Sequence, residues 1–200
     1  MDITTFQNSI DEHLIANSGL DLKRDYLGIS QIGKCPRQVV RDFLHGKSDV
    51  TLLAHQMCYV GYLFERDVMS RLREIGIVAP GTAYEVVAEF DKRLRGHVDG
   101  ETVDGELVEI KSVSRAKYEK VKQTHMALHE HFAQVQLYMK YGPWKKCWIV
   151  YVCRDTLEHH VVKVTYLHTQ GVKFELKAQR MLSFIDQGIL PECECRWCKE

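Results

Sequence analysis

The segment 96–111, GHVDGETVDGELVEIK, constrains the fold of this 200-residue chain most strongly, because it reads as two strands joined by a defined turn. Residues 103–105 suit a type I turn followed by a glycine in the left-handed conformation, which is a three-residue hairpin loop with a bulge. Glycine adopts that last position without a steric penalty. Counting outward from the loop predicts that Asp99 lies opposite Glu109, with both side chains on one face of the ribbon.

The same face of the hairpin carries an amine, because the two-residue period of a strand directs Glu109 and Lys111 to one side. Two facing carboxylates repel unless a cation lies between them, and hard oxygen ligands favour magnesium or manganese. Such an ion polarises a phosphate oxygen, while a neighbouring ammonium neutralises developing charge. Asp99, Glu109 and Lys111 are therefore candidate catalytic residues for phosphodiester cleavage. The open alternative is an ordinary hairpin whose outward face carries solvated charges.

The residues around the hairpin carry a recognisable pattern. Gly96-x-x-Asp99, followed by Glu109, Ile110 and Lys111 on the second strand, resembles the core signature of the PD-(D/E)XK nuclease superfamily. Valine stands before the aspartate where proline is usual, a difference that the superfamily tolerates. The resemblance implies a restriction-endonuclease-like α/β fold, with a mixed central sheet flanked by helices.

A second motif occurs at residues 131–138, which read HFAQVQLY. His131 followed by Gln134 and Tyr138 resembles the helical motif of the RecB-like exonuclease branch of that superfamily. Gln134 and Tyr138 are four residues apart and so share one face of a helix. The resemblance implies that both residues support Lys111 or contact the scissile phosphate. Taken alone, the pattern also fits a helix with an apolar core face and exposed polar residues.

A long helix near 51–75 is predicted by apolar residues at helical spacing, and Glu65 lies beside this apolar ridge. In RecB-like nucleases a histidine or glutamate at this place joins the metal ligands. The resemblance therefore implies that Glu65, Asp99, Glu109 and the Ile110 carbonyl hold one or two Mg²⁺ or Mn²⁺ ions. Without the resemblance, a glutamate flanked by charged residues is by default solvated. The residues of the ridge are Leu53, Met57, Val60, Phe64, Val68 and Leu72.

The seven cysteines are the next signal, because their number is odd and the chain shows no signal peptide or membrane-spanning apolar run. We therefore expect an intracellular, reduced protein in the cytoplasm, encoded by a bacterium, an archaeon or a phage, with no membrane partner. Cys58, Cys147 and Cys153 occur in apolar patterns and are predicted to lie in the core.

The other four cysteines form a separate group, with Cys35 before proline and arginine, and Cys193, Cys195 and Cys198 near the carboxyl end. This arrangement resembles the iron–sulfur site of CRISPR-associated RecB-like exonucleases and implies a [4Fe–4S] cluster that joins the two chain ends. The spacing Cys-x-Cys-x-x-Cys departs from the usual one. Zinc therefore remains a competing ion, because tetrahedral four-cysteine sites accept many spacings.

Positive charge is distributed unevenly along the chain, although 27 Lys and Arg balance 27 Asp and Glu overall. The whole molecule is therefore not a polycation that binds DNA by bulk attraction. Residues 111–146 hold a local basic excess, which predicts phosphate contacts beside the catalytic strand, although solvated helix faces are an equal alternative. The candidate DNA contacts are Arg37, Arg115, Lys117, Lys122 and His131. The candidates for base stacking, if exposed, are Tyr118, Tyr138 and Tyr141.

The predicted elements alternate in a way that is typical of the α/β class. We expect one nuclease domain over 1–200, with an N-terminal helical region (1–30), a helical part with the cysteine cluster (31–75 and 166–200) and a catalytic core (83–165). Helices are predicted near 4–16, 35–45, 51–75, 115–127, 131–141 and 170–187. Strands are predicted near 83–90, 94–101, 106–113, 147–154 and 158–165.

The motifs together predict a metal-dependent deoxyribonuclease, namely an exonuclease acting on single-stranded DNA or DNA ends. Its role would lie in recombination, repair or CRISPR adaptation, with a recombination protein or a CRISPR integrase as a possible partner. The sequence does not separate these roles. An alternative of another class is a non-catalytic DNA-binding module stapled by zinc, in which the acidic residues have no catalytic role.

Overall fold

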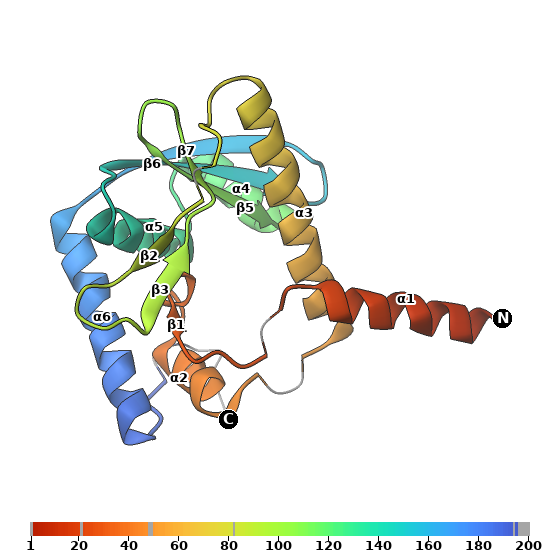
Figure 1. Ribbon diagram of the computed structural model, residues 1–200, viewed down its shortest axis with the longest axis horizontal. Helices are drawn as coiled ribbons and strands as arrows, with labels where there is room; N and C mark the ends of the chain where they lie inside the picture. The colour runs from red at the N-terminus through yellow and green to blue at the C-terminus, as the bar shows by residue number, and fades with distance from the viewer. Residues whose placement is uncertain (1, 21, 48–49, 82, 194, 196–200) are drawn as a thin grey trace.

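The computed structural model describes residues 2–20, 22–47, 50–81, 83–193 and 195. Helices and strands alternate in the predicted order, which confirms the α/β class (Figure 1). The elements are α1 (Ile3–Asn17), β1 (Leu27–Gly28), the 3₁₀ helix η1 (Ile29–Gln31), α2 (Pro36–His45), α3 (Leu52–Glu74), β2 (Glu85–Val87), β3 (Leu94–His97), β4 (Gly100–Glu101), β5 (Leu107–Val113), α4 (Arg115–Thr124), α5 (His129–Tyr141), β6 (Lys146–Cys153), β7 (His159–Thr165) and α6 (His168–Gln187).

The main sheet has the strand order β4-β5-β6-β7, in which β5 and β6 are parallel and the other pairs are antiparallel. A smaller sheet has the order β1-β3-β2. β5 and β6 are almost continuously buried, as expected for strands covered on both faces. On one face Val68 and Met69 of α3 pack against Val108 and Ile110 of β5. A larger core, which includes residues of α5 and α6, fills the rest of the interior.

The predicted hairpin loop at residues 103–105 is confirmed. Gly105 has φ +76°, and the Thr102 amide donates to the Glu106 carbonyl at 2.8 Å. Gly100 pairs with Val108 and Glu101 with Leu107, which are the pairs that the loop predicts, and continuing this count by one residue sets Asp99 against Glu109. The predicted register is therefore the observed one.

The strand expected over 94–101 differs from the structure, which divides it into β3 and β4 in two different sheets. The division falls at Val98 and Asp99. The Val98 amide donates to the Tyr84 carbonyl at 3.0 Å, whereas the Asp99 side chain accepts the Ile110 amide at 2.6 Å. A carboxylate thus takes a place that a backbone carbonyl would fill in a continuous ladder, and it ends the pairing there.

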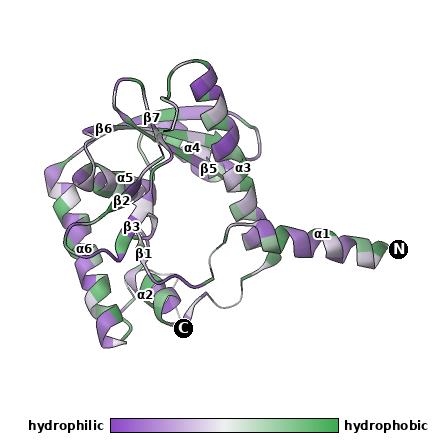
Figure 2. Ribbon diagram, viewed as in Figure 1, coloured by the Kyte–Doolittle hydropathy of each residue, from purple (hydrophilic) through white to green (hydrophobic). Residues whose placement is uncertain are grey.

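The N-terminal helix α1 projects from the rest of the molecule and meets it at α3 (Figure 1). Asp2 caps the helix by accepting the Thr5 amide at 2.9 Å, and no residue of α1 is buried. Hydrophobic and hydrophilic residues alternate along it (Figure 2). The apolar ridge expected on α3 is covered in its second half, where Val68 is buried, but Leu53 in its first turn is 63% exposed. Within the described ranges, no helix has the length and apolar character needed to cross a membrane.

Candidate active site

Two acidic residues meet at the edge where β4 stops pairing with β5. Glu109 lies in the middle of β5 and is only 1% exposed, while Asp99 is half-buried just before β4. Asp99 Oδ2 accepts the Ile110 amide at 2.6 Å. Because the amide and carbonyl of one strand residue point to the same edge, the Ile110 carbonyl is directed to the Asp99 side of β5. The hairpin therefore gathers three oxygen donors at this edge.

One oxygen of Glu109 has two hydrogen-bond partners and the other has none among the described residues. Lys111 Nζ forms an ion pair with Glu109 Oε1, and Gln134 Nε2 donates to the same oxygen at 2.7 Å. Glu109 Oε2 is buried without a hydrogen-bond partner in the described part of the chain. Buried carboxylate oxygens are normally satisfied, and an ion is one way to satisfy them. Oε2 is therefore a fitting ligand for a cation.

The acids of this site outnumber its amine. Burial, together with the negative charge of Asp99, raises the pKa of Glu109 to about 8 and that of Glu65 to about 7. Burial also raises the pKa of Asp99. Burial alone would lower the pKa of Lys111, but Glu109 and Asp99 raise it well above its usual value. Three carboxylates beside one ammonium leave two negative charges uncompensated when ionised, which matches a divalent cation.

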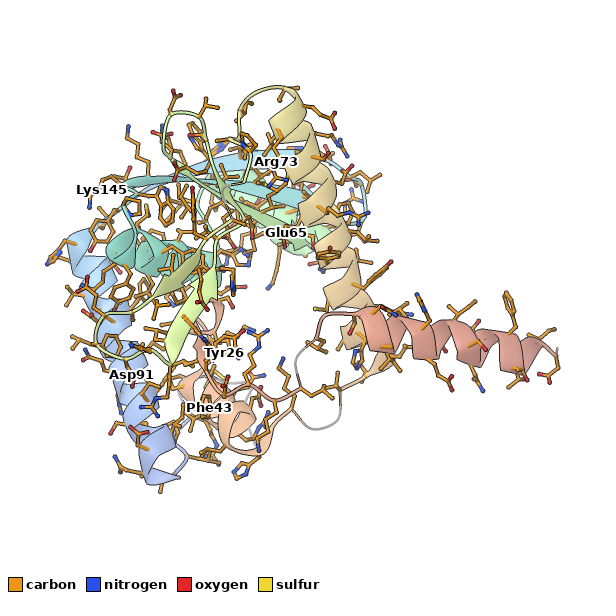
Figure 3. All side chains as sticks on the ribbon, in the orientation of Figure 1. Tyr26, Phe43, Glu65, Arg73, Asp91 and Lys145 are labelled. Atoms are coloured by element: carbon orange, nitrogen blue, oxygen red, sulfur yellow. The ribbon has the colours of Figure 1, made fainter. Side chains whose placement is uncertain are left out.

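Glu65 reaches this group from α3, on the side of the helix that faces the sheet (Figure 3). It lines a cleft of about 580 Å³ together with Ile110, Lys111 and Ser112 of β5. The carboxylates of Glu65, Asp99 and Glu109 do not form a closed cage, since among the described residues only a cysteine group has its ligand atoms within 4.8 Å of one another. Magnesium tolerates such an open set, because it uses one or two carboxylates plus water and substrate phosphate.

Gln134 and Tyr138 lie on one face of α5 and are both buried. Gln134 Nε2 lies 3.2 Å from Tyr138 Oη, which donates to the His97 carbonyl at 2.7 Å. A Cβ atom at Gly96 would lie only 2.9 Å from Tyr138 Oη, so glycine permits this close approach of β3. The chain of contacts runs from β3 through Tyr138 and Gln134 to Glu109, and it holds the carboxylate in place. Tyr138 is buried, so it does not meet the condition of exposure on which base stacking was expected.

His131 begins the same motif, but its side chain is directed into the protein. His131 Nδ1 lies 3.1 Å from Tyr151 Oη, which accepts the Leu128 amide at 3.0 Å. Burial, followed by the positive charge of Lys111, lowers the pKa of His131 to about 3. The imidazole is therefore neutral near pH 7 and adds no positive charge to the surface.

Replacing His131 with glutamine should make the protein less sensitive to acid. The unfolded chain binds a proton on His131 below about pH 6.5, whereas the folded protein does so only near pH 3. Stability is therefore lost as the pH falls from 6.5 towards 3, and the loss reaches about 2 kcal/mol at pH 5. Denaturant unfolding measures this contribution as a difference: the free energy of unfolding of His131→Gln relative to that of the wild type should rise by about 2 kcal/mol between pH 7.5 and pH 5. The exposed His129→Gln is the control, and equal acid sensitivity of wild type and His131→Gln would contradict this account.

The basic residues of the predicted DNA-binding stretch lie at the surface of α4. Arg115, Lys117 and Lys122 are exposed. Lys117 pairs with Glu130 at 2.9 Å and Lys122 with Glu158 at 3.3 Å. Acidic partners thus offset part of the local positive charge that the sequence indicated.

Other residues that the sequence proposed as DNA contacts have partners within the protein. Arg37 Nη1 donates to the Pro191 carbonyl at 3.1 Å and so ties α2 to the segment after α6. Tyr118 is 1% exposed, and Tyr141 Oη donates to Glu175 at 2.7 Å. Tyr118 therefore does not meet the condition of exposure on which base stacking was expected, because its ring belongs to the core.

Three of the four predicted cluster cysteines come together. The sulfur atoms of Cys35, Cys193 and Cys195 lie within 4.8 Å of one another, and those of Cys193 and Cys195 are 3.8 Å apart. Cys198 lies outside the described residues. Cys35 occupies the N-cap position of α2, directly before Pro36. A group of thiols at this distance can hold a metal ion or a cluster.

The remaining cysteines divide between the core and the cleft. Cys147 and Cys153 are fully buried, as predicted. Cys58 is only half-buried and lines the cleft beside Glu65. The prediction of a core position was wrong for Cys58, because α3 turns this part of its surface toward the cleft.

Sequence reasoning missed the residues near the end of α1 that line the cleft. Asn17, Ser18 and Gly19 line it from the end of α1. Ser18 Oγ lies 2.8 Å from Nδ1 of His55, and both residues are buried. A serine and a histidine 37 positions apart form no sequence motif that would predict their contact. The one local signal is a histidine in the otherwise apolar first turn of α3.

The comparisons with known proteins concern the fold. No protein-family model and no curated protein matches the sequence. The crystal structure of an alkaline exonuclease (LHK-Exo) from Laribacter hongkongensis is similar, with a TM-score of 0.64 and 16% identity over 88% of this chain and 93% of that chain.

Two further solved structures agree with this result. LHK-Exo in complex with dAMP has a TM-score of 0.63 and 16% identity over 89% of this chain and 93% of that chain. The structure of SSO0001 has a TM-score of 0.62 and 17% identity over 94% of this chain and 91% of that chain. The predicted fold is therefore confirmed, and the chain has the fold of the PD-(D/E)XK-type nucleases.

Proposed function

We propose that this chain is a Mg²⁺- or Mn²⁺-dependent deoxyribonuclease that removes nucleotides from single-stranded DNA or from DNA ends. The observation that carries the proposal is the buried Glu109 oxygen without a hydrogen-bond partner among the described residues, beside Asp99 and Lys111 at the edge of a cleft. The exonuclease fold of LHK-Exo, and its structure with dAMP, support DNA as the substrate class.

The oxygen donors of the hairpin and α3 are the proposed ligands of one or two divalent ions. They are the carboxylates of Asp99, Glu109 and Glu65 and the carbonyl of Ile110. A bound divalent ion would polarise the scissile phosphate and lower the pKa of a water molecule. Asp99 is held for this role by the Ile110 amide, and Glu109 by Gln134. These hydrogen bonds keep both carboxylates oriented before substrate arrives.

Lys111 is the proposed catalytic amine. Its ammonium would orient the attacking water and neutralise charge that develops on the phosphate. The raised pKa of Lys111 keeps it protonated across the physiological range. Gln134 and Tyr138 would act as positioning residues, because they contact Glu109 and the His97 carbonyl. Arg115, Lys117 and Lys122 would contact the phosphate backbone from α4, since their side chains are exposed.

A cleavage assay tests this function directly. End-labelled single-stranded and double-stranded DNA is incubated with the purified protein and with Mg²⁺, Mn²⁺ or a chelator. We expect nucleotides to be released with either metal and not with the chelator. Binding of DNA without cleavage under all three conditions would instead indicate a non-catalytic DNA-binding module.

We further propose that Cys35, Cys193, Cys195 and Cys198 hold a [4Fe–4S] cluster, with Zn²⁺ as the competing ion. The proposal is supported by the three sulfur atoms that lie within 4.8 Å of one another and by the hydrogen bond from Arg37 to Pro191. Such a site would tie α2 to the carboxyl end and contribute folding free energy. Anaerobic purification followed by iron and zinc analysis distinguishes the two ions.

Cys35→Ser should remove the bound metal and lower stability by about 3 kcal/mol or more, because a structural metal site contributes its binding free energy to folding. Metal content and denaturant unfolding measure the two effects. Cys58→Ser is the control, since Cys58 lies in the cleft wall, and it should keep the metal. Full metal content in Cys35→Ser would exclude this residue as a ligand.

The proposed activity is compatible with several biological roles, so the role needs its own test. Recombination, repair and CRISPR adaptation all require trimming of DNA ends. Co-purification with a single-strand annealing protein would support the first role, and co-purification with an integrase would support CRISPR adaptation.

A further inference from the structure

The cleft beside Glu65 contains one exposed aromatic ring. It is lined by the end of α1, by the face of α3 from Cys58 to Glu65, and by Ile110, Lys111 and Ser112 of β5. Its volume of about 580 Å³ lies within the range of pockets that bind small organic ligands. Tyr62 belongs to this lining and is 54% exposed. An aromatic ring exposed in a cleft is available to a planar ligand.

Tyr62 lies one helical turn before Glu65, so both residues lie on the same face of α3. Gly61, beside Tyr62, keeps this part of the cleft open. A Cβ atom at Gly61 would lie 3.6 Å from Ser112 Oγ, and any larger side chain would extend into the space between α3 and β5. The lining therefore combines the charged side chains of Glu65 and Lys111 with the exposed ring of Tyr62.

The end of α1 that lines the cleft is held in place by hydrogen bonds. Ser18 Oγ lies 2.8 Å from His55 Nδ1 and donates to the Ile15 carbonyl at 3.1 Å. Ser18 and His55 are both buried. These contacts hold the end of α1 against the first turns of α3. The cleft lining thus combines ionic groups with neutral, partly aromatic ones, and a nucleotide likewise combines a charged phosphate with a planar base.

We propose that the cleft is a nucleobase subsite, in which the ring of Tyr62 stacks on one unpaired base next to the phosphate held near Lys111 and Glu65. This inference rests on the proposed function and specifies its substrate as a nucleotide whose base is free of its partner. A base in a duplex is covered on both faces and on its pairing edge, so it must leave the stack to reach Tyr62. Stacking is tolerant of sequence, because every base has a π-face.

An abasic scan combined with Tyr62→Ala tests the subsite. Single-stranded oligonucleotides carry one abasic position, moved stepwise from the end, and kcat/KM is measured for the 200-residue protein with Mn²⁺. Stacking on an aromatic side chain contributes about 1–3 kcal/mol, which is a factor of about 5–150. We expect one abasic position to reduce kcat/KM of the wild type by such a factor. Tyr62→Ala should show the same reduction on intact DNA and no further loss at that position.

Two variants separate stacking from other effects. Tyr62→Phe keeps the ring and should retain wild-type behaviour. Tyr84→Ala removes another exposed tyrosine, which packs near Trp144 and does not line the cleft, and it should leave the abasic profile unchanged. If the reduction in kcat/KM from Tyr62→Ala and the reduction from an abasic site multiply at every position tested, the ring and the base act independently. That result would overturn the stacking proposal.

The same pairs of protein and DNA are also compared by fluorescence anisotropy in the presence of a chelator, which reports binding without cleavage. Coupling between Tyr62 and one base in this assay, with no cleavage under any metal condition, would support the subsite and reject the nuclease. Cleavage that depends on metal, with no coupling in either assay, would support the nuclease and reject the subsite.

Discussion

Glu109→Gln is expected to reduce the rate of DNA cleavage about 100-fold or more and, at the same time, to stabilise the metal-free protein. Removal of one preorganised charge at a reacting centre typically costs a factor of about 10²–10³. The amide keeps the shape of the side chain. Its oxygen can still accept from Lys111 and Gln134, while its NH₂ group replaces the buried oxygen that has no partner among the described residues.

The gain in stability follows from the sign of the pKa shift. Burial and the charge of Asp99 raise the pKa of Glu109 from 4.5 to about 8 in the folded, metal-free protein. Between these pH values the folded state holds a proton that the unfolded state releases, so stability falls as the pH rises. The loss is on the order of 4 kcal/mol at pH 8 and is near zero at pH 4.5. Glutamine does not titrate, so Glu109→Gln avoids this loss.

Denaturant unfolding with a chelator at pH 5 and pH 8 measures the effect, and Glu106→Gln is the matched control. Glu106 accepts from Trp148 and pairs with Lys146 and Lys163, and these partners lower its pKa although partial burial opposes the shift. Its replacement should therefore be neutral or destabilising. If Glu109→Gln is less stable than the wild type at pH 8, then Glu109 has a structural ion-pair role and the metal assignment loses its support.

The parts of this site that the sequence predicts are those fixed by local geometry. The loop at Gly105 sets the register of the hairpin, and the register sets Asp99 against Glu109. The four-residue spacing of Gln134 and Tyr138 likewise fixes a shared helical face, and the structure joins that face to Glu109. In both cases a few adjacent residues determine the relative direction of the side chains, so tertiary contacts have little to change.

The parts that the sequence does not predict depend on contacts between distant segments. The end of α1 lines the cleft because Ser18 is hydrogen-bonded to His55 of α3. No periodicity in the sequence predicts this contact. The continuous strand expected over 94–101 is divided because the Asp99 side chain takes the Ile110 amide. The exposure of single residues is equally hard to predict from the sequence, since Tyr118 lies in a basic, polar helix and is nevertheless buried in the core. Helical spacing identifies a face, but the neighbouring elements decide whether that face meets solvent.

Lys111→Met is expected to reduce the rate of DNA cleavage at least as strongly as Glu109→Gln does, but with the opposite effect on the stability of the metal-free fold. Lys111 is the amine that pairs with Glu109 and lies in the field of Asp99 and Glu65. Removing it leaves three acids without this compensating charge, and breaking a buried pair costs about 3–5 kcal/mol. Unfolding with a chelator at pH 8 should show this loss. Lys122→Met removes an exposed partner of Glu158 instead, and it should change stability by about 1 kcal/mol or less.

Measurements of stability and cleavage with Mn²⁺ distinguish a catalytic role of Lys111 from a structural one. A divalent cation that binds the folded state stabilises it by mass action, and the gain grows with affinity. Lys111→Met leaves more uncompensated negative charge than the wild type, so Mn²⁺ should raise its melting temperature more than that of the wild type. Glu109→Gln lacks a ligand, so its melting temperature should rise least. If Lys111→Met, restored in stability by Mn²⁺, also cleaved DNA at the wild-type rate, the amine would only balance charge. Continued absence of cleavage in a metal-stabilised fold would assign to Lys111 a direct part in the reaction.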